Sequence, residues 1–168
     1  MEREFEVAVV GGGPTGLTAA IALAGAGIET ALISKAPPAD NRTSALLSGS
    51  VTALEVLGIW PLCRVESAAL TAIRLIDDTA RLLRAPEVMF EAAEIGLEAF
   101  GYNIENRHLI AALDRRAARL PRLECIDAAA TAVEPDDASV TIRLGHRGSI
   151  HQAVVLQKMK KWAGPTSV

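Results

Sequence analysis

Short apolar runs separated by a glycine-rich turn open the chain. Residues 5–10 form a β-branched run that is typical of a buried parallel strand. Residues 17–26 are good helix formers that end at glycine, and residues 28–33 form a second strand. The apolar face of the helix is expected to consist of Leu17, Ala20, Ile21 and Ala24. A strand, a turn, a helix and a strand within about thirty residues predict a βαβ unit.

The rest of the chain mixes helical and strand patterns. These predict a helix over residues 45–57, a hairpin over residues 70–84, a helix over residues 107–120 and strands over residues 123–126 and 139–144. Ser44 is the expected N-cap of the first of these helices, and Gly58 is expected to end it. Asp77 and Asp78 are expected to make the turn of the hairpin, with Leu82 in the returning strand. The whole pattern predicts an α/β, Rossmann-like domain with a parallel sheet, plus a small β element.

Composition excludes several functional classes. Half of the 168 residues are apolar, which is enough for a packed core. The net charge of −3 leaves no basic footprint for nucleic acid. No run reaches the roughly 18 apolar residues of a membrane span, and the charged start is unlike a signal peptide. Cys63 and Cys125 show no pairing pattern, and the three histidines lack the spacing of a metal site. We therefore expect a cytoplasmic protein without a metal site.

The turn after the first strand carries a dinucleotide-binding fingerprint, Gly11-x-Gly13-x-x-Gly16. Gly11 allows the tight turn, Gly13 lets a pyrophosphate approach the backbone, and Gly16 lets the helix pack close to the sheet. Pro14 and Thr15 complete the expected cofactor-binding turn. The first helical turn has backbone N–H groups without partners and carries about half a positive charge. The sequence therefore predicts that a diphosphate binds at this helix N-terminus.

The end of the second strand leaves the identity of the dinucleotide open. An acidic residue is expected there to bind the ribose hydroxyls, but the position holds Ser34, followed by Lys35. A serine hydroxyl bonds a ribose oxygen more weakly than a carboxylate does. Ser34 and Lys35 together would also suit the 2′-phosphate of NADP. Local chemistry therefore leaves FAD and NADP as alternatives.

Five segments resemble one family more specifically than the glycine fingerprint does. They are residues 11–17 (GGGPTGL), 42–51 (RTSALLSGSV), 57–60 (LGIW), 76–79 (IDDT) and 101–106 (GYNIEN). They are similar to the FAD-dependent aromatic-ring hydroxylases, above all to the ubiquinone-biosynthesis branch that acts on 2-octaprenyl-6-methoxyphenol and similar rings. The resemblance covers residues 5–145 and favours FAD over NADP.

The resemblance implies a flavoprotein monooxygenase in which NAD(P)H reduces FAD and O₂ supplies the oxygen atom that is added to a prenylated phenol ring. It places the three glycines of the turn at the FAD diphosphate and Ser34 near the adenosine ribose. Arg42 matches an arginine that bonds flavin or diphosphate oxygens, and Arg107 matches a flavin-side position. It identifies no catalytic residue. Association with a membrane surface, with other ubiquinone-pathway enzymes or with a second copy of the chain stays open.

The chain also departs from that family. Its members are much longer and carry an aspartate–glycine motif after the strand near residues 140–144 and a glycine–aspartate motif later, whereas residues 144–148 read LGHRG. Arginine is confined to residues 1–149, and lysine is concentrated after them. We therefore expect a FAD-binding domain over residues 1–145 that is incomplete for catalysis, and a divergent tail over residues 146–168, for example from a frameshift. The alternatives are a non-catalytic nucleotide-binding module and an NADP-binding domain that uses Ser34 and Lys35.

Overall fold

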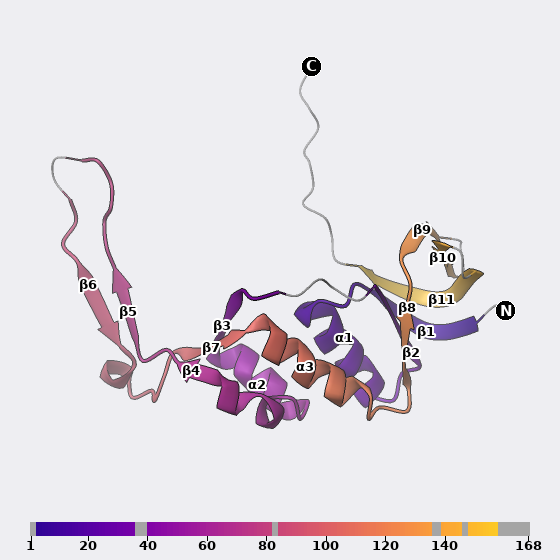
Figure 1. Cartoon of the computed structure of the whole chain (residues 1–168), viewed down its shortest axis with the longest axis horizontal. Helices are drawn as coiled ribbons and strands as arrows, with labels where there is room; N and C mark the ends of the chain where they lie inside the picture. Colours follow the sequence, from indigo (N-terminus) through magenta and orange to yellow (C-terminus); the bar gives the residue numbers. More distant parts are fainter. Residues whose placement is uncertain (1–2, 36–39, 82–83, 136–138, 146–147, 158–168) are drawn as a thin grey trace, which may run out of the picture. The chain divides into compact units, whose positions relative to one another are not determined.

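The computed structural model divides the chain into two compact units (Figure 1). The structure describes residues 3–35, 40–81, 84–135, 139–145 and 148–157. The sheet unit comprises Met1–Asp40 and Ile110–Val168, and the hairpin unit comprises Asn41–Leu109. Each unit is described by itself below.

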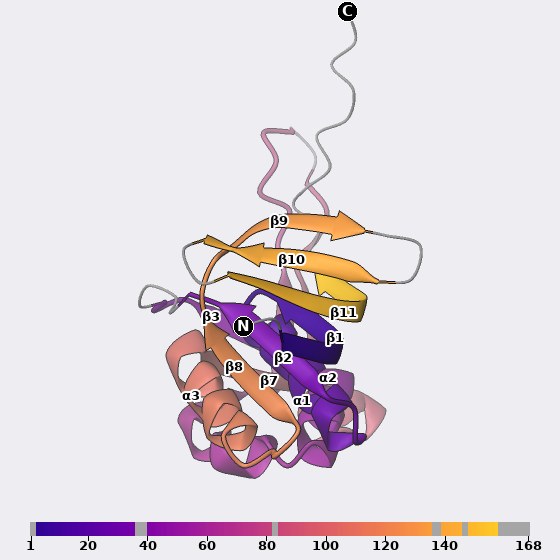
Figure 2. The ribbon, with the colours of Figure 1, turned by 90° about the vertical axis from the view of Figure 1, so that its right-hand side faces the viewer.

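A six-stranded sheet runs through the described residues of the sheet unit (Figure 2). In order across the sheet the strands are β8 (Leu123–Asp127), β2 (Thr30–Ser34), β1 (Arg3–Val10), β11 (Gly148–Gln157), β10 (Val140–Leu144) and β9 (Ala130–Pro135). The first four of these run parallel to one another, and β10 and β9 are antiparallel to their neighbours. The predicted strands near residues 5–10, 28–33, 123–126 and 139–144 are therefore confirmed.

Helix α1 (Pro14–Gly25) connects β1 to β2 and completes the predicted βαβ unit. Its buried residues are Leu17, Ala20, Ile21 and Ala24, which are the four that the helical spacing predicts. Helix α3 (Asn106–Ala117) begins in the hairpin unit and continues into the sheet unit, where it leads to β8. It matches the helix expected over residues 107–120.

Strand β2 is buried on both faces, and so is β1 over Val7, Ala8 and Val9. Helices α1 and α3 cover one face of the parallel strands (Figure 2). Leu32 of β2 points to that face and is 4% exposed. Ala31 and Ile33 point to the opposite face, where they join a core cluster with Ala8, Ile142 and Leu144. Burial on both faces explains why β1 and β2 read as nearly continuous apolar runs in the sequence.

The hairpin unit contains two small antiparallel sheets. The three-stranded sheet has the order β3 (Thr43–Leu47), β7 (Gly101–Glu105) and β4 (Ser67–Ala69), and the two-stranded sheet pairs β5 (Ala72–Leu75) with β6 (Val88–Glu91). The remaining elements are helix α2 (Ser48–Val56) and the single 3₁₀ turns Trp60–Leu62, Arg64–Glu66 and Ala92–Ile95. The buried ring of Trp60 and the half-buried ring of Tyr102 pack edge to face, with their centroids 5.1 Å apart.

Two predictions for the hairpin unit need correction. Ser44 does not cap a helix, because residues 43–47 form β3, which pairs with β7 so that Thr43 lies opposite Glu105. Helix α2 begins at Ser48 instead, and its N-terminal cap residue is Leu47. Gly58, with a φ of 71°, follows the end of that helix as predicted.

The hairpin over residues 70–84 has a longer loop than the sequence predicts. Strand β5 contains the expected alternation, but its partner β6 begins at Val88. The expected return at Leu82 lies outside the described residues. Asp77 does make a turn, since its carboxylate accepts hydrogen bonds from the N–H groups of Thr79 (3.0 Å) and Ala85 (2.9 Å).

Within the described part of the chain, no helix is both long and apolar enough to cross a bilayer.

Candidate functional site

The backbone of the glycine turn between β1 and α1 requires glycine at two positions, Gly11 and Gly16. Gly11 has a φ of +118°, which L side chains rarely adopt, and its N–H donates to the carbonyl oxygen of Ile33 at 2.9 Å. A Cβ atom added at Gly16 would overlap the carbonyl oxygen of Gly11 and lie 3.0 Å from its carbonyl carbon. These two glycines are therefore needed by the backbone itself.

Gly13 differs from its neighbours in the same turn. It has φ −74° and ψ 174°, which any residue adopts. A Cβ atom added there would meet nothing within 4 Å, whereas one added at Gly12 would lie 2.7 Å from the Cβ of Ser34. The space in front of Gly13 is open, so the folded chain alone gives no reason for glycine at this position. A ligand that approaches the backbone would give one.

The N-terminus of α1 has the features of an anion-binding site. Its N-cap residue makes no side-chain cap hydrogen bond, and its first turn contains no acidic residue. Within the described part of the chain, the backbone N–H groups of Gly12, Gly13, Thr15 and Gly16 have no hydrogen-bond acceptor. Free donors and the positive end of the helix dipole together favour a phosphate group.

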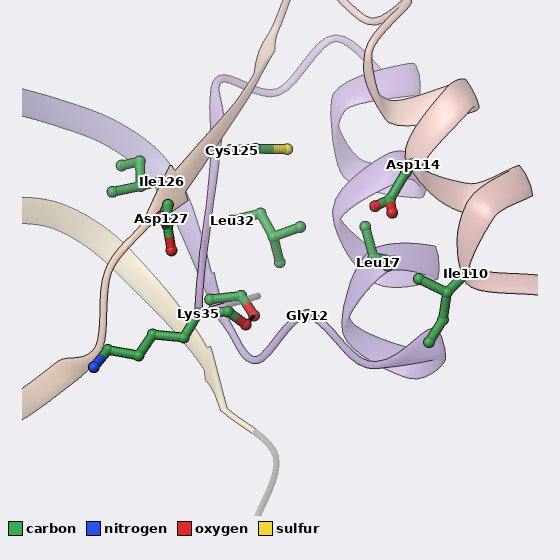
Figure 3. A pocket seen from close by; sticks show the side chains of 10 residues that line it. Gly12, Leu17, Leu32, Lys35, Ile110, Asp114, Cys125, Ile126 and Asp127 are labelled. Atoms are coloured by element: carbon green, nitrogen blue, oxygen red, sulfur yellow. Dashed lines mark hydrogen bonds between the residues drawn. The ribbon is translucent and has the colours of Figure 1, made fainter. Parts of the chain in front are cut away.

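A cavity of about 270 Å³ lies between the helices and the ends of β2 and β8 (Figure 3). Its apolar wall includes Leu17, Leu32 and Ile110, and its polar groups include Ser34, Asp114 and Asp127. Figure 3 shows Leu32 and Cys125 pointing toward the helices and Ile126 pointing away from them. The cavity begins at Gly12, so it continues directly from the glycine turn.

Two ionisable groups in this cavity are shifted toward their neutral forms. Burial raises the pKa of the Asp114 carboxyl, which Figure 3 shows directed into the cavity. Burial, and to a smaller extent the negative charge of Asp114, raise the pKa of the Cys125 thiol. Burial is the larger cause of both shifts, and both weaken the tendency of these groups to carry a negative charge. Neither residue is predicted from the sequence to have a functional role.

The strand ends place three charged or polar residues at the outer part of the cavity. Ser34 ends β2, and its hydroxyl donates to the carbonyl oxygen of Lys35 at 2.9 Å. The side chain of Lys35 extends away from Gly12 (Figure 3). Asp127 ends β8 and is the register partner of Ser34. Sequence reasoning missed Asp127, although its position at the carboxyl end of a predicted strand was a signal.

The two predicted arginines belong to the hairpin unit. Arg42 precedes β3, and its carbonyl oxygen accepts a hydrogen bond from the N–H of Asn106 at 2.9 Å. Arg107 makes an ion pair with Glu105 at 2.7 Å. Both arginines thus lie at the end of the β3–β7 pair where Thr43 pairs with Glu105. Their roles at a flavin stay predictions.

Comparisons with known proteins identify a family. The family model described as FAD dependent oxidoreductase matches residues 6–164. No curated protein matches the sequence.

Solved structures share the fold at low sequence identity. They include p-nitrophenol 4-monooxygenase PnpA from Pseudomonas putida DLL-E4 (TM-score 0.74, 20% identity, 93% of this chain and 41% of that chain). OxyS anhydrotetracycline hydroxylase from Streptomyces rimosus is similar (TM-score 0.74, 22% identity, 92% and 31%). So is the flavin-dependent monooxygenase PieE in complex with FAD and substrate (TM-score 0.73, 20% identity, 90% and 29%). This chain therefore spans less than half the length of these three proteins, and the predicted Rossmann-like fold is confirmed.

Proposed function

The chain belongs to the FAD-dependent oxidoreductase family, and we propose that its glycine turn and the N-terminus of α1 hold the diphosphate of FAD. The open space in front of Gly13 carries this proposal, because a Cβ atom there would meet no atom of the protein within 4 Å. The unpartnered N–H groups of the same turn supply donors for the phosphate oxygens. The absence of acidic side chains from the first turn of α1 leaves the positive helix end unopposed.

The cavity beside the turn suits the adenosine part of FAD. Its volume of about 270 Å³ is slightly below the roughly 300–1,000 Å³ of sites that enclose a whole small molecule. It therefore takes one portion of a dinucleotide rather than all of it. Ser34 lies between the turn and the rest of the cavity, since a Cβ atom on Gly12 would meet its side chain. Adenosine bound here would keep its ribose at Ser34.

We propose that the reaction in which this domain takes part is the hydroxylation of an aromatic ring. PnpA is a p-nitrophenol 4-monooxygenase and OxyS is an anhydrotetracycline hydroxylase. The resemblance of residues 42–51 and 101–106 to the ubiquinone-biosynthesis hydroxylases supports a prenylated phenol as substrate and NAD(P)H as electron donor. When bound, FAD would supply the redox chemistry, and this chain's own residues would bind and orient it. Arg42 and Arg107 are the residues that we propose for the flavin side.

A pair of glycine substitutions in one helix tests FAD binding. Gly13→Ala should fold normally and lose FAD affinity by about 1–3 kcal/mol, because the new methyl group occupies the diphosphate site. Titration of FAD fluorescence against the protein measures the affinity, and circular dichroism measures folding. Gly25→Ala is the matched control, since Gly25 lies near the other end of α1 and also has open space around its Cβ position. If Gly13→Ala binds FAD as tightly as Gly25→Ala does, the proposed binding mode is wrong.

A further inference from the structure

The carboxyl end of β8 supplies a carboxylate that β2 lacks. Dinucleotide-binding folds place an acidic residue at the end of the second strand to bind the ribose, and here Ser34 occupies that position. Asp127 is its register partner in the neighbouring parallel strand. Residues in register on neighbouring strands project to the same face of a sheet. Both side chains accordingly line the same cavity.

The strand ends form a path that leads from the phosphate site to Asp127. The sheet order places β2 between β1 and β8, and neighbouring strands are about 4.8 Å apart. The turn at the end of β1 contacts Ser34 at the end of β2, as the position of a Cβ atom on Gly12 shows. A ligand that starts with its diphosphate at Gly13 and continues across these ends reaches Ser34 and then Asp127. Figure 3 shows Asp127 on the β8 side of this path.

Asp127 is available as a hydrogen-bond acceptor. Its side chain is exposed, and no ion pair or hydrogen bond joins it to any residue that the structure describes. The hydroxyl proton of Ser34 is already donated to the carbonyl oxygen of Lys35. A ribose carries two hydroxyl donors, and an ionised carboxylate accepts more than one hydrogen bond. The cavity's other carboxyl, Asp114, lies on α3, and burial raises its pKa toward the neutral form.

We propose that Asp127 binds the ribose hydroxyls of the adenosine in FAD and so replaces the missing acid of β2. This inference rests on the proposed FAD binding at the glycine turn. A carboxylate strengthens these hydrogen bonds because the acceptor is charged. The same negative charge repels a phosphate on the ribose 2′-oxygen. Asp127 therefore also favours FAD over NADP, the choice that Ser34 and Lys35 alone leave open.

Binding of ADP and 2′,3′-dideoxy-ADP, measured by isothermal titration calorimetry, tests the proposal. The wild-type chain should bind ADP at least about tenfold more tightly than 2′,3′-dideoxy-ADP, because only ADP offers ribose hydroxyl donors to the carboxylate of Asp127. In Asp127→Asn this preference should fall to about threefold or less. Asp114→Asn, which removes a carboxyl from the same cavity, is the matched control and should keep the wild-type preference. Affinity for NADP⁺ relative to NAD⁺ should rise in Asp127→Asn only.

The outcomes separate this inference from the proposed function. If the wild-type chain binds neither FAD nor ADP, both are wrong. If it binds both but Asp127→Asn keeps the full preference for ADP, or if the wild-type chain shows no preference, FAD binding stands and the role of Asp127 is wrong. Because Asp127 is exposed, its substitution leaves the core intact, and circular dichroism verifies that the variant folds.

Discussion

Strand β2 in the sheet unit and the β5–β6 pair in the hairpin unit use similar residues in opposite surroundings. Four of the five residues of β2 are buried, and Ile33 is 1% exposed. All eight residues of β5 and β6 are exposed, and Ile73 is 41% exposed. One face of this hairpin is entirely apolar, because Ile73 pairs with Phe90 and Leu75 pairs with Val88. The comparison shows that apolar alternation reveals a strand without revealing whether the strand contributes to a core.

Ile33→Ala should have the largest effect on stability. The side chain fills the core cluster with Ala8, Ile142 and Leu144, and its truncation leaves a cavity on the face opposite the helices. Deletion of a buried isoleucine side chain to alanine costs about 2–5 kcal/mol of unfolding free energy. Urea unfolding, followed by circular dichroism, measures the loss. A loss below about 1 kcal/mol would mean that β2 is not the central buried strand of this unit.

Gly16→Ala should have the next largest effect, and it should appear in folding rather than in ligand binding alone. The added Cβ overlaps the carbonyl oxygen of Gly11, so the start of α1 must move away from β1. Overpacking of this kind costs about 1–3 kcal/mol. Urea unfolding of Gly16→Ala should show this loss, whereas Gly13→Ala should unfold like the wild-type chain. If the two variants unfold alike, the distinction between backbone glycines and a ligand glycine is wrong.

Sequence reasoning succeeded where the decisive signal is local. The face of α1 and the strands on either side of it follow from helical spacing and from continuous apolar runs. The same reasoning missed β3, because that strand forms through pairing of Thr43–Leu47 with β7, far along the chain. Only that long-range pairing overrides the helical start that Ser44 suggests.

The candidate site was predictable in part for the same reason. The glycine spacing is a local motif, and Gly11 and Gly16 have the conformation and close contact that it requires. The position of Asp127 directly after a predicted strand was a signal for a binding residue, but its place beside Ser34 depends on the register between β2 and β8, which the sequence does not show. The pattern identified β8 as a strand but carried no information about its neighbour in the sheet.

Ile73→Thr should barely change stability, which sharpens the contrast with Ile33→Ala. Threonine keeps the β-branched side chain that suits a strand, and the lost contact with Phe90 is a half-exposed cross-strand pair. Such pairs contribute roughly 0.2–1 kcal/mol, so we expect a loss at the lower end of this range in urea unfolding. Binding of a hydrophobic fluorescent dye to the folded chain should fall, because the apolar face is smaller. A loss as large as that of Ile33→Ala would place Ile73 in a core.

Protonation of Asp77 should have the smallest effect on the structure, confined to the hairpin loop and visible only at acidic pH. Hydrogen bonds from the N–H of Ala85 and from Thr79 lower the pKa of the Asp77 carboxyl from its ordinary value of 3.8. A carboxyl whose pKa is lower in the folded state stabilises the fold fully at a pH above its ordinary pKa. This stabilisation disappears as the pH falls through the lowered pKa of the folded state. Nuclear magnetic resonance should therefore show the amide signals of Thr79 and Ala85 shifting together with the titration of Asp77 below pH 3.8. In Asp77→Ala both shifts should vanish while urea unfolding at neutral pH stays close to that of the wild-type chain. Hydrogen bonds to Asp77 then stabilise this loop, whereas apolar packing around Ile33 stabilises β2. Titration of Asp77 at or above its ordinary pKa would contradict this role of the carboxylate.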